Sequence, residues 1–170
     1  MFAKYQTYDY PYASKLNSFL YNIINENIRT TISGGGRRTS YDLHKREFKE
    51  VDSILKWIYQ IIPLASDYFC GGNGGLRFDV NTLKVASCWG VSYNKGEGVI
   101  RHNHFPYSLS FVYCINEPNN FSPILLEGEK VSLIPGRAVV FLSHQFHSCP
   151  PARVNGRCSL VGNIRIVNFV

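Results

Sequence analysis

The stretch that decides the fold covers residues 84–115 and reads KVASCWGVSYNKGEGVIRHNHFPYSLSFVYCI. β-Branched and aromatic residues gather in three short runs within it, at 84–93, 99–104 and 109–115, and turn-forming residues such as Asn94-Lys95-Gly96 separate them. Runs of this length with this punctuation are typical of β-strands. The stretch therefore predicts three short strands.

Strand-like runs continue to the end of the chain. Turn residues such as Glu127-Gly128 and Pro135-Gly136 separate them. About eight short strands with this punctuation indicate an antiparallel sandwich or barrel. The further expected strands cover residues 76–80, 124–126, 130–133, 138–142 and 157–167.

The part of the chain before these strands has helical spacing. Apolar residues from Ala13 to Ile28 fall on one helix face. A second helix is expected to begin near Ser40 or Asp42, either of which could cap it, and to end or kink at Pro63. The intervening segment 31–40, TISGGGRRTS, contains three consecutive glycines and predicts a mobile loop. Two helices covering one sheet from outside would give an α+β domain.

Length and composition indicate one globular domain. The chain has 170 residues, of which 45% are apolar and 18% charged. No apolar run approaches the roughly 20 residues of a membrane helix, and the N-terminus lacks the pattern of a secretory signal. Five scattered cysteines without a C-x-x-C pair indicate reduced thiols, so we expect a cytoplasmic protein without a membrane partner. The cysteines are Cys70, Cys88, Cys114, Cys149 and Cys158.

The net charge is +6 and the isoelectric point is about 9.1. This balance fits either an anionic partner or a preference for solubility. Basic residues in the helical part are too dispersed for the dense block of a nucleic-acid-binding arm, so they do not favour a nucleic-acid partner. They are Arg37, Arg38, Lys45, Arg46, Lys49 and Lys56.

Four of the five histidines fall in the strand-rich part, whereas His44 is expected on the surface of the second helix. Because side chains alternate along a strand, His102 and His104 point the same way and could bind one ion. A third ligand would come from the segment that contains His144 and His147. His147 is preferred because it follows an apolar strand and precedes the sequence Cys149-Pro150-Pro151, where the chain would leave the barrel. A metal ligand is expected at such a barrel mouth.

The last expected strand carries polar residues on one face. By the same alternation Arg157, Ser159 and Asn163 share a face, and Cys158 and Leu160 take the other. An arginine and a hydroxyl on an inward face can bind a carboxylate, the arginine with both arms of its fork. A carboxylate ligand is therefore expected at this strand.

Each of these features also has a purely structural explanation. A strand histidine is more often packed or solvated than a metal ligand, and a late-strand arginine is often one half of a surface ion pair. The H-x-H pair, the distal His147 and the Arg157-x-Ser159 step in this order are harder to explain that way. Together they favour a metal site.

Several short motifs stand in a fixed order between Trp89 and Asn163. With this order and spacing the stretch, somewhat under half of the chain, resembles the double-stranded β-helix core of the 2-oxoglutarate and iron(II)-dependent oxygenases. Within them it is similar to a prolyl-hydroxylase-like branch with phage and bacterial members. The motifs are Trp89 with Lys95-Gly96, His102-x-His104 followed by Pro106, the run 108–113, Pro135-Gly136 with 139–141, His147-x-x-Pro150-Pro151, and Arg157-x-Ser159-x-x-x-Asn163.

The resemblance implies roles for individual residues. His102 would be the first metal ligand and His147 the distal one. Arg157 would pair with the distal carboxylate of 2-oxoglutarate, and Ser159 would assist it. The remaining candidates for contacts with co-substrate or substrate are Tyr93 and Asn163.

Position 104 departs from the family pattern, in which H-x-D or H-x-E is usual. Here it is His104, which either binds the metal or turns toward the substrate. Three imidazoles can still hold ferrous iron and leave positions open, but the site loses a negative charge. Glu97 and Glu117 are too far along the chain to be obvious substitutes.

The resemblance further implies a jelly-roll, cupin-like core at about 76–170 with helical support at about 1–70, together one domain of residues 1–170. Such an enzyme would use 2-oxoglutarate and O2 to hydroxylate an unactivated C–H bond of a peptide or small molecule, releasing succinate and carbon dioxide. It would act in the cytoplasm, or in the host cytoplasm if phage-encoded. The glycine-rich segments 34–36 and 71–75 could be lids or substrate loops.

Two other hypotheses stay open. The first is a three-histidine, cupin-type metal dioxygenase that does not use 2-oxoglutarate, in which Arg157 is incidental. The second is a non-enzymatic basic β-sandwich module, with the histidines serving only as packing. Binding of 2-oxoglutarate separates the first from an oxygenase of the resembled family, and metal content separates the second.

Overall fold

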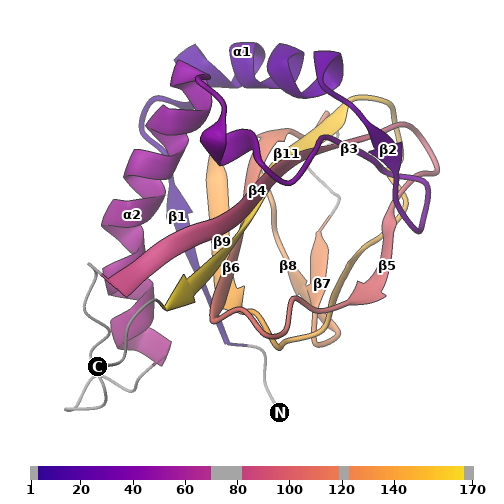
Figure 1. The fold of residues 1–170 in the computed structure, drawn as a ribbon. Coiled ribbons are helices and arrows are strands. Elements are labelled where there is room, and N and C mark those ends of the chain that lie inside the picture. The colour runs from indigo at the N-terminus through magenta and orange to yellow at the C-terminus, as the bar shows by residue number, and fades with distance from the viewer. Residues whose placement is uncertain (1–3, 70–81, 119–122, 167–170) are drawn as a thin grey trace.

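The computed structural model describes residues 4–69, 82–118 and 123–166. Over these residues the chain forms two α-helices and two antiparallel β-sheets (Figure 1). The expected combination of antiparallel strands with two helices is confirmed.

The larger sheet has, over the described residues, the strand order β1-β9-β6-β11-β4-β3-β2. β11, the last described strand, lies between β6 and β4 and pairs with both. It therefore joins the two halves of the sheet. All of these pairings are antiparallel. The strands are β1 (Tyr5–Asp9), β2 (Thr30–Thr31), β3 (Arg37–Arg38), β4 (Leu83–Tyr93), β6 (Leu109–Asn116), β9 (Arg137–Leu142) and β11 (Arg157–Ile166).

The smaller sheet packs face to face with the larger one. Apolar side chains from both sheets form a single cluster, which includes Val112 and Phe141 of the larger sheet and Leu126 of the smaller. This arrangement is the usual way in which two sheets bury their inner faces. The smaller sheet has the order β5-β10-β7-β8, with β5 (Val99–His102), β7 (Ile124–Leu126), β8 (Glu129–Val131) and β10 (His147–Cys149).

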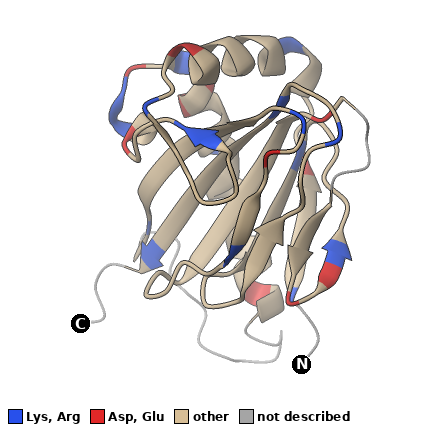
Figure 2. Ribbon diagram, turned by 90° about the vertical axis from the view of Figure 1, so that its right-hand side faces the viewer, with Lys and Arg blue, Asp and Glu red and all other residues tan. Residues whose placement is uncertain are grey.

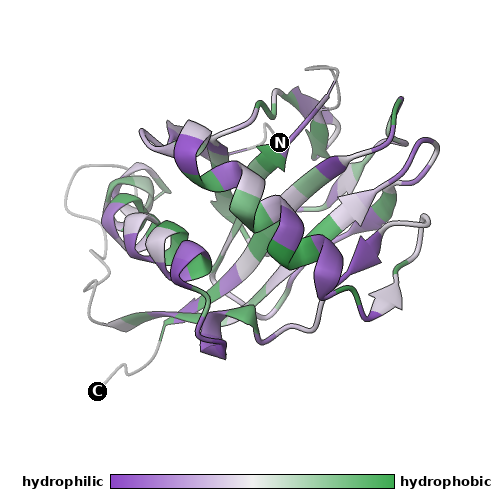
Figure 3. Ribbon diagram, turned by 90° about the horizontal axis from the view of Figure 1, so that it is seen from above, coloured by the Kyte–Doolittle hydropathy of each residue, from purple (hydrophilic) through white to green (hydrophobic). Residues whose placement is uncertain are grey.

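Two helices, α1 (Ala13–Glu26) and α2 (Lys49–Phe69), cover the outer face of the larger sheet (Figure 1). Hydrophobic and hydrophilic residues alternate around both helices when the molecule is seen from above (Figure 3). The apolar side chains of both helices pack with those of the larger sheet in a second cluster. Burial of this face stabilises the helices more than intrinsic propensity does.

The alternation predicted for the last strand is confirmed. Cys158 and Leu160 are buried in the cluster under the helices, whereas Val161 belongs to the cluster between the sheets. Arg157 and Ser159 lie four and two residues before Val161 on the same strand, so their side chains also face the space between the two sheets.

The expected start of the second helix at Ser40 or Asp42 is wrong. Leu43–Lys45 forms a separate 3₁₀ turn, η1, and α2 begins only at Lys49. Asp42 forms a bridge with Cys88 of β4, so this backbone is tied to the sheet and cannot continue a helix. His44 consequently lies in η1, where it is partly buried, and not on the second helix.

Of the two outcomes expected at Pro63, an end of the second helix or a kink, the end is wrong. α2 continues through Pro63 to Phe69. Proline costs about 3 kcal/mol inside a helix because it lacks an N–H and crowds the preceding turn. Ile62 and Ala65 on either side are buried against the sheet, and this continuous packing offsets the cost.

The segment 31–40 is not the mobile loop that its glycines predicted. β2 and β3 pair as a hairpin, and β3 adds to the edge of β4 with Arg37 opposite Ser92. Gly34 and Gly35 have φ values of 101° and 91°, a conformation that other residues rarely adopt. The glycines therefore form the turn of the hairpin, which places β2 and β3 at the edge of the sheet.

Other strand predictions have mixed outcomes. β1, which pairs with β9, and β10 were not expected. The strand expected at 99–104 ends at His102, so His104 lies beyond it. The strand expected at 76–80, the glycines at 71–75 and Cys70 lie outside the described residues, whereas the other four cysteines are free and buried.

Neither helix of the described chain has both the length and the apolar character needed to cross a bilayer. Basic and acidic residues are interspersed over several elements (Figure 2). Arg137 pairs with Asp9 at 2.7 Å, and Arg37 lies 3.7 Å from Glu97. These two arginines are thus locally neutralised, while the net charge of the chain stays +6.

Candidate metal centre

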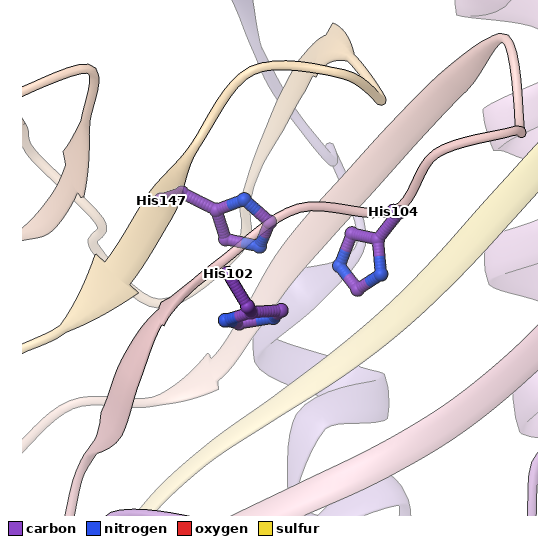
Figure 4. A group of neighbouring side chains, drawn as sticks. All are labelled: His102, His104 and His147. Atoms are coloured by element: carbon purple, nitrogen blue, oxygen red, sulfur yellow. The ribbon is translucent and has the colours of Figure 1, made fainter.

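Three histidines converge between the two sheets. His102 ends β5 and lies directly opposite His147, which begins β10. His104 follows two residues later, and its ring centroid lies 5.0 Å from that of His102 and 4.8 Å from that of His147. One potential ligand atom from each residue lies within 4.8 Å of the other two. Figure 4 shows the three rings turned toward one another.

His104 lies outside regular structure but is held from two sides. Its backbone N–H donates to the carbonyl of Ser143 at 2.8 Å. Its ring packs edge-on against Trp89, with 5.6 Å between centroids. The loop after β9 and a side chain of β4 therefore fix the third histidine.

Backbone carbonyls orient the other two rings. Nδ1 of His102 lies 2.8 Å from the carbonyl of Ile100, and Nδ1 of His147 lies 3.3 Å from that of Gln145. A ring that donates from Nδ1 has Nε2 left as a lone-pair donor to a metal. Both histidines can therefore present Nε2.

Nε2 of His104 is buried and has no hydrogen-bond partner. Buried polar atoms are nearly always paired, so such an atom calls for an explanation. A metal ion would satisfy it. Nitrogens that share one ion lie about 3 to 4 Å apart, close to the spacing of these three donors. The residues present fit a divalent ion with imidazole ligands.

The electrostatics of the site favour neutral imidazoles. Burial, with a smaller contribution from the neighbouring His102, lowers the pKa of His104 to about 4. Burial lowers the pKa of His147 to about 3, with smaller contributions from His102 and His104. Both rings are thus unprotonated at neutral pH, which is the state that binds a metal.

An apolar cavity adjoins the three histidines. Its polar lining includes Tyr93, Ser148 and Ser159. Burial raises the pKa of Tyr93, so its phenol stays neutral and can donate a hydrogen bond. The apolar lining residues are Ile32, Trp89, Val91, Val99, Val112, Ile124, Leu133 and Val161.

A second, more open cleft also reaches His104. His104 and Trp89 line both the cavity and the cleft. The outer part of the cleft carries Tyr41 and Phe105, which are 50% and 75% exposed. His44 also lines this cleft, and so it is not the plain surface residue expected from the sequence.

Arg157 is buried and lies next to an acidic side chain. It is 1% exposed, and its Nε lies 3.1 Å from Oε2 of Glu117, which is also buried. Its Nη1 donates to the carbonyl of Pro150 at 3.3 Å. Among the described residues that line the cavity are Tyr93 and Ser159 but not Arg157. Arg157 lies behind this lining, with its guanidinium carbon 5.4 Å from the ring centroid of Tyr93.

Glu117 is the site residue that sequence reasoning missed. It was considered only as a substitute metal ligand, and nothing local links it to Arg157 because the two are far apart in the chain. Glu117 directly follows β6, and Arg157 begins β11, which pairs with β6. Only knowledge of this strand pairing would have indicated that the two residues are neighbours.

Asn163 does not line the cavity as Ser159 does. Its amide donates to Ser87 at 3.1 Å, and its carbonyl oxygen accepts from Ser110 at 2.9 Å. Ser110 in turn contacts the hydroxyl of Ser143 at 2.7 Å, and the carbonyl of Ser143 binds the N–H of His104. Asn163 thus helps to hold the strands and the loop that carries His104.

His144 lies apart from the site. It is exposed, whereas His147 is 6% exposed. The group of convergent metal-binding side chains found among the described residues contains His147 and not His144.

No protein-family model and no curated protein sequence matches this chain. Its structure is similar to that of a prolyl-4-hydroxylase from Pseudomonas putida, with 20% identity, a TM-score of 0.70, and coverage of 96% of this chain and 93% of that one. It is also similar to a viral collagen prolyl hydroxylase from Paramecium Bursaria Chlorella virus-1, solved with 2-oxoglutarate: 14% identity, a TM-score of 0.70, and coverage of 96% and 97%.

A third solved structure is the epimerase SnoN in complex with Fe³⁺, alpha-ketoglutarate and nogalamycin RO. Here the identity is 12%, the TM-score is 0.66, and the coverage is 96% of this chain and 79% of that one. At these identities the similarity establishes the fold. The chain therefore has the fold seen in prolyl hydroxylases and in an iron- and alpha-ketoglutarate-bound epimerase.

Proposed function

We propose that this chain is a 2-oxoglutarate- and iron(II)-dependent oxygenase that hydroxylates a C–H bond. The observation that carries the proposal is the convergence of His102, His104 and His147 beside a buried cavity. The fold supports it, because proteins of this fold have been solved with 2-oxoglutarate and with iron. In this proposal the two sheets are the halves of a double-stranded β-helix and residues 1–170 form one domain.

The three imidazoles would hold the metal as a facial triad. Imidazole suits iron(II), and three protein ligands leave adjacent positions for other groups. When bound, iron(II) together with 2-oxoglutarate supplies the chemistry that activates O2, with release of succinate and carbon dioxide. The His104 ligand replaces the carboxylate of the usual pattern, so the triad itself carries no negative charge.

The cavity beside the triad would hold the co-substrate. Tyr93 and Ser159 can donate hydrogen bonds to its carboxylate oxygens, and Arg157 lies behind them at the start of the same strand as Ser159. The apolar walls exclude water and thereby strengthen these polar contacts. Asn163 would act by positioning the loop that fixes His104.

The open cleft would receive the primary substrate, a peptide or a small molecule. It reaches His104 past Trp89, and the exposed rings of Tyr41 and Phe105 offer apolar contact at its mouth. Exposed aromatic residues beside a buried centre are typical of binding sites. The substrate C–H bond would thus approach the metal along the side of His104 that lines the cleft.

Succinate formation tests this function. Purified protein supplied with iron(II), 2-oxoglutarate and O2 is expected to form succinate. His147→Ala should abolish most of this turnover because it removes a proposed metal ligand. Arg157→Ala should lower it sharply because it leaves the buried carboxylate of Glu117 unpaired behind the cavity. The exposed His144→Ala provides the matched control. Unchanged succinate formation in both His147→Ala and Arg157→Ala would contradict the proposed roles.

One observation favours a second candidate, a three-histidine cupin-type dioxygenase that does not use 2-oxoglutarate. Arg157 is already paired with Glu117 and lies behind the described cavity lining. In that enzyme Arg157 is a structural residue. Anaerobic titration with 2-oxoglutarate separates the two, because only the first candidate develops the metal-to-ligand absorption band of a chelated 2-oxo acid.

A further inference from the structure

Glu117 and Arg157 form a buried ion pair behind the histidine cavity. Glu117 follows β6 and Arg157 begins β11, and their side chains are 2% and 1% exposed. Tyr93, which lines the cavity, lies opposite Arg157 in the pairing of β4 with β11, and its ring centroid is 5.4 Å from the guanidinium carbon. The pair is therefore close enough to influence an acidic ligand in the cavity.

The charge of Arg157 is balanced within the protein. A guanidinium is permanently positive, and Glu117 is a carboxylate at 3.1 Å from Nε. Attraction between buried charges is strong because the surroundings screen them poorly. An incoming carboxylate therefore meets a neutral pair and not a lone cation.

Displacing Glu117 would not help such a ligand. A buried carboxylate that has lost its partner is strongly unfavourable, so the gain from a new contact with Arg157 would be offset. The second carboxylate of a dicarboxylic ligand consequently adds little to its affinity.

We infer that Glu117 sets the co-substrate specificity of the site by lowering its preference for a dicarboxylic over a monocarboxylic 2-oxo acid. This inference rests on the proposed function, because it concerns the acid that binds beside the metal. It assigns to Glu117 a role in specificity with no part in metal binding or proton transfer.

The charges of the whole site are consistent with this role. Three neutral imidazoles and a divalent ion carry two positive charges, and the Arg157–Glu117 pair adds none. A site with two imidazoles, one carboxylate ligand, a divalent ion and an unpaired arginine would also carry two positive charges. The negative charge that a carboxylate would contribute at position 104 is thus contributed here by Glu117, beside the arginine.

The test is an anaerobic titration of the iron(II)-loaded protein with two acids of equal length. These are 2-oxoglutarate and 2-oxopentanoate, which has a methyl group in place of the second carboxylate, and binding is followed by the metal-to-ligand absorption band. The wild-type dissociation constants should differ by less than about fivefold. In Glu117→Gln the constant for 2-oxoglutarate should fall by about tenfold, the gain expected for one charge-assisted contact, while that for 2-oxopentanoate stays within about twofold.

Glu26→Gln is the matched control. Glu26 is exposed at the end of α1, so this variant makes the same change in net charge away from the site. It should bind both acids as the wild-type protein does. An equal gain in Glu26→Gln would assign the effect to overall charge and overturn the inference.

Two further outcomes are decisive. A wild-type protein that prefers 2-oxoglutarate a hundredfold or more, with no gain in Glu117→Gln, would overturn the role of Glu117 while leaving the proposed function intact. Absence of binding of either acid to the wild-type protein and to Glu117→Gln would instead contradict the proposed function.

A paired variant covers the case in which Glu117→Gln does not fold. Glu117→Gln combined with Arg157→Gln removes both buried charges together and leaves neither unpaired. Its ratio of dissociation constants should match the wild-type ratio, since the neutralised arginine contributes little to selection. A selective loss of 2-oxoglutarate affinity in this variant would show that Arg157 anchors the acid despite Glu117, and the inference would be wrong.

Discussion

His147 lies directly opposite His102 in the antiparallel pairing of β10 with β5, and their ring centroids are 4.3 Å apart. In such a pair both side chains leave the sheet on the same face. The backbone register of two short strands therefore brings His102 and His147 together, and His104 joins them from the adjoining segment.

His102→Ala should weaken iron(II) binding by more than about a hundredfold, because even groups that merely orient a metal ligand contribute about 10- to 100-fold. The measurement is equilibrium dialysis under anaerobic conditions with metal analysis of the protein fraction. His144→Ala, which alters an exposed histidine, should bind iron as the wild-type does. Equal affinity in His102→Ala would rule out the three-histidine site.

His104→Asp should retain iron(II) binding, while His104→Ala should reduce it severely. An aspartate at this position recreates the two-histidine, one-carboxylate triad that suits non-haem iron. The same dialysis experiment compares the two variants. If His104→Ala binds iron as tightly as the wild-type protein, the buried Nε2 of His104 faces the substrate and not the metal.

Arg157→Met should destabilise the protein by about 3–5 kcal/mol, because it leaves the buried carboxylate of Glu117 without its partner. Adding Glu117→Gln to this variant should recover much of the loss. Urea unfolding of the two single variants and the double variant gives the interaction energy of the pair. Additive losses would mean that the two side chains do not interact in solution.

Gly90→Ala should lower the stability by about 1–3 kcal/mol through overpacking beneath α1. A Cβ at this position would lie 2.3 Å from Cγ1 of Ile24. Truncation of the opposing side chain makes room, so Gly90→Ala combined with Ile24→Ala should be less destabilised than the sum of the two single changes. Thermal unfolding of the three variants checks this, and strict additivity would show that the helix shifts freely.

Acidification should destabilise the metal-free protein between about pH 6.5 and pH 4. His104 and His147 have folded-state pKa values of about 4 and about 3, so the unfolded chain binds more protons in this window. The free energy of unfolding that the two neutral histidines contribute above the ordinary histidine pKa is therefore lost as the pH falls toward their folded-state pKa values. Urea unfolding at neutral pH and at about pH 5 measures the loss. It should be smaller in the His104→Gln, His147→Gln double variant, and an equal loss would contradict burial as its cause.

Local patterns in the sequence predicted much of the site. Alternation along the last strand separated Arg157 and Ser159 from Cys158. The H-x-H spacing selected His102 and His104, although His104 lies beyond the end of β5 and is placed by its contacts with Ser143 and Trp89. Helical spacing located α1. These features depend on residues a few positions apart, whose geometry the backbone itself dictates.

The errors arose where distant segments decide local structure. The glycine-rich segment 31–40 becomes a hairpin because the edge of β4 offers hydrogen-bonding partners. α2 passes through Pro63 because buried neighbours hold it to the sheet. In both places tertiary packing outweighed the preference of the residues themselves.

Residues close together in the chain thus established which side chains of a strand share a face and which chemistry they can perform. The meeting of His147 with His102 and the pairing of Glu117 with Arg157 depend on the folded molecule. Side-chain alternation is a property of a single strand, whereas register and burial arise when segments far apart in the chain pair with each other.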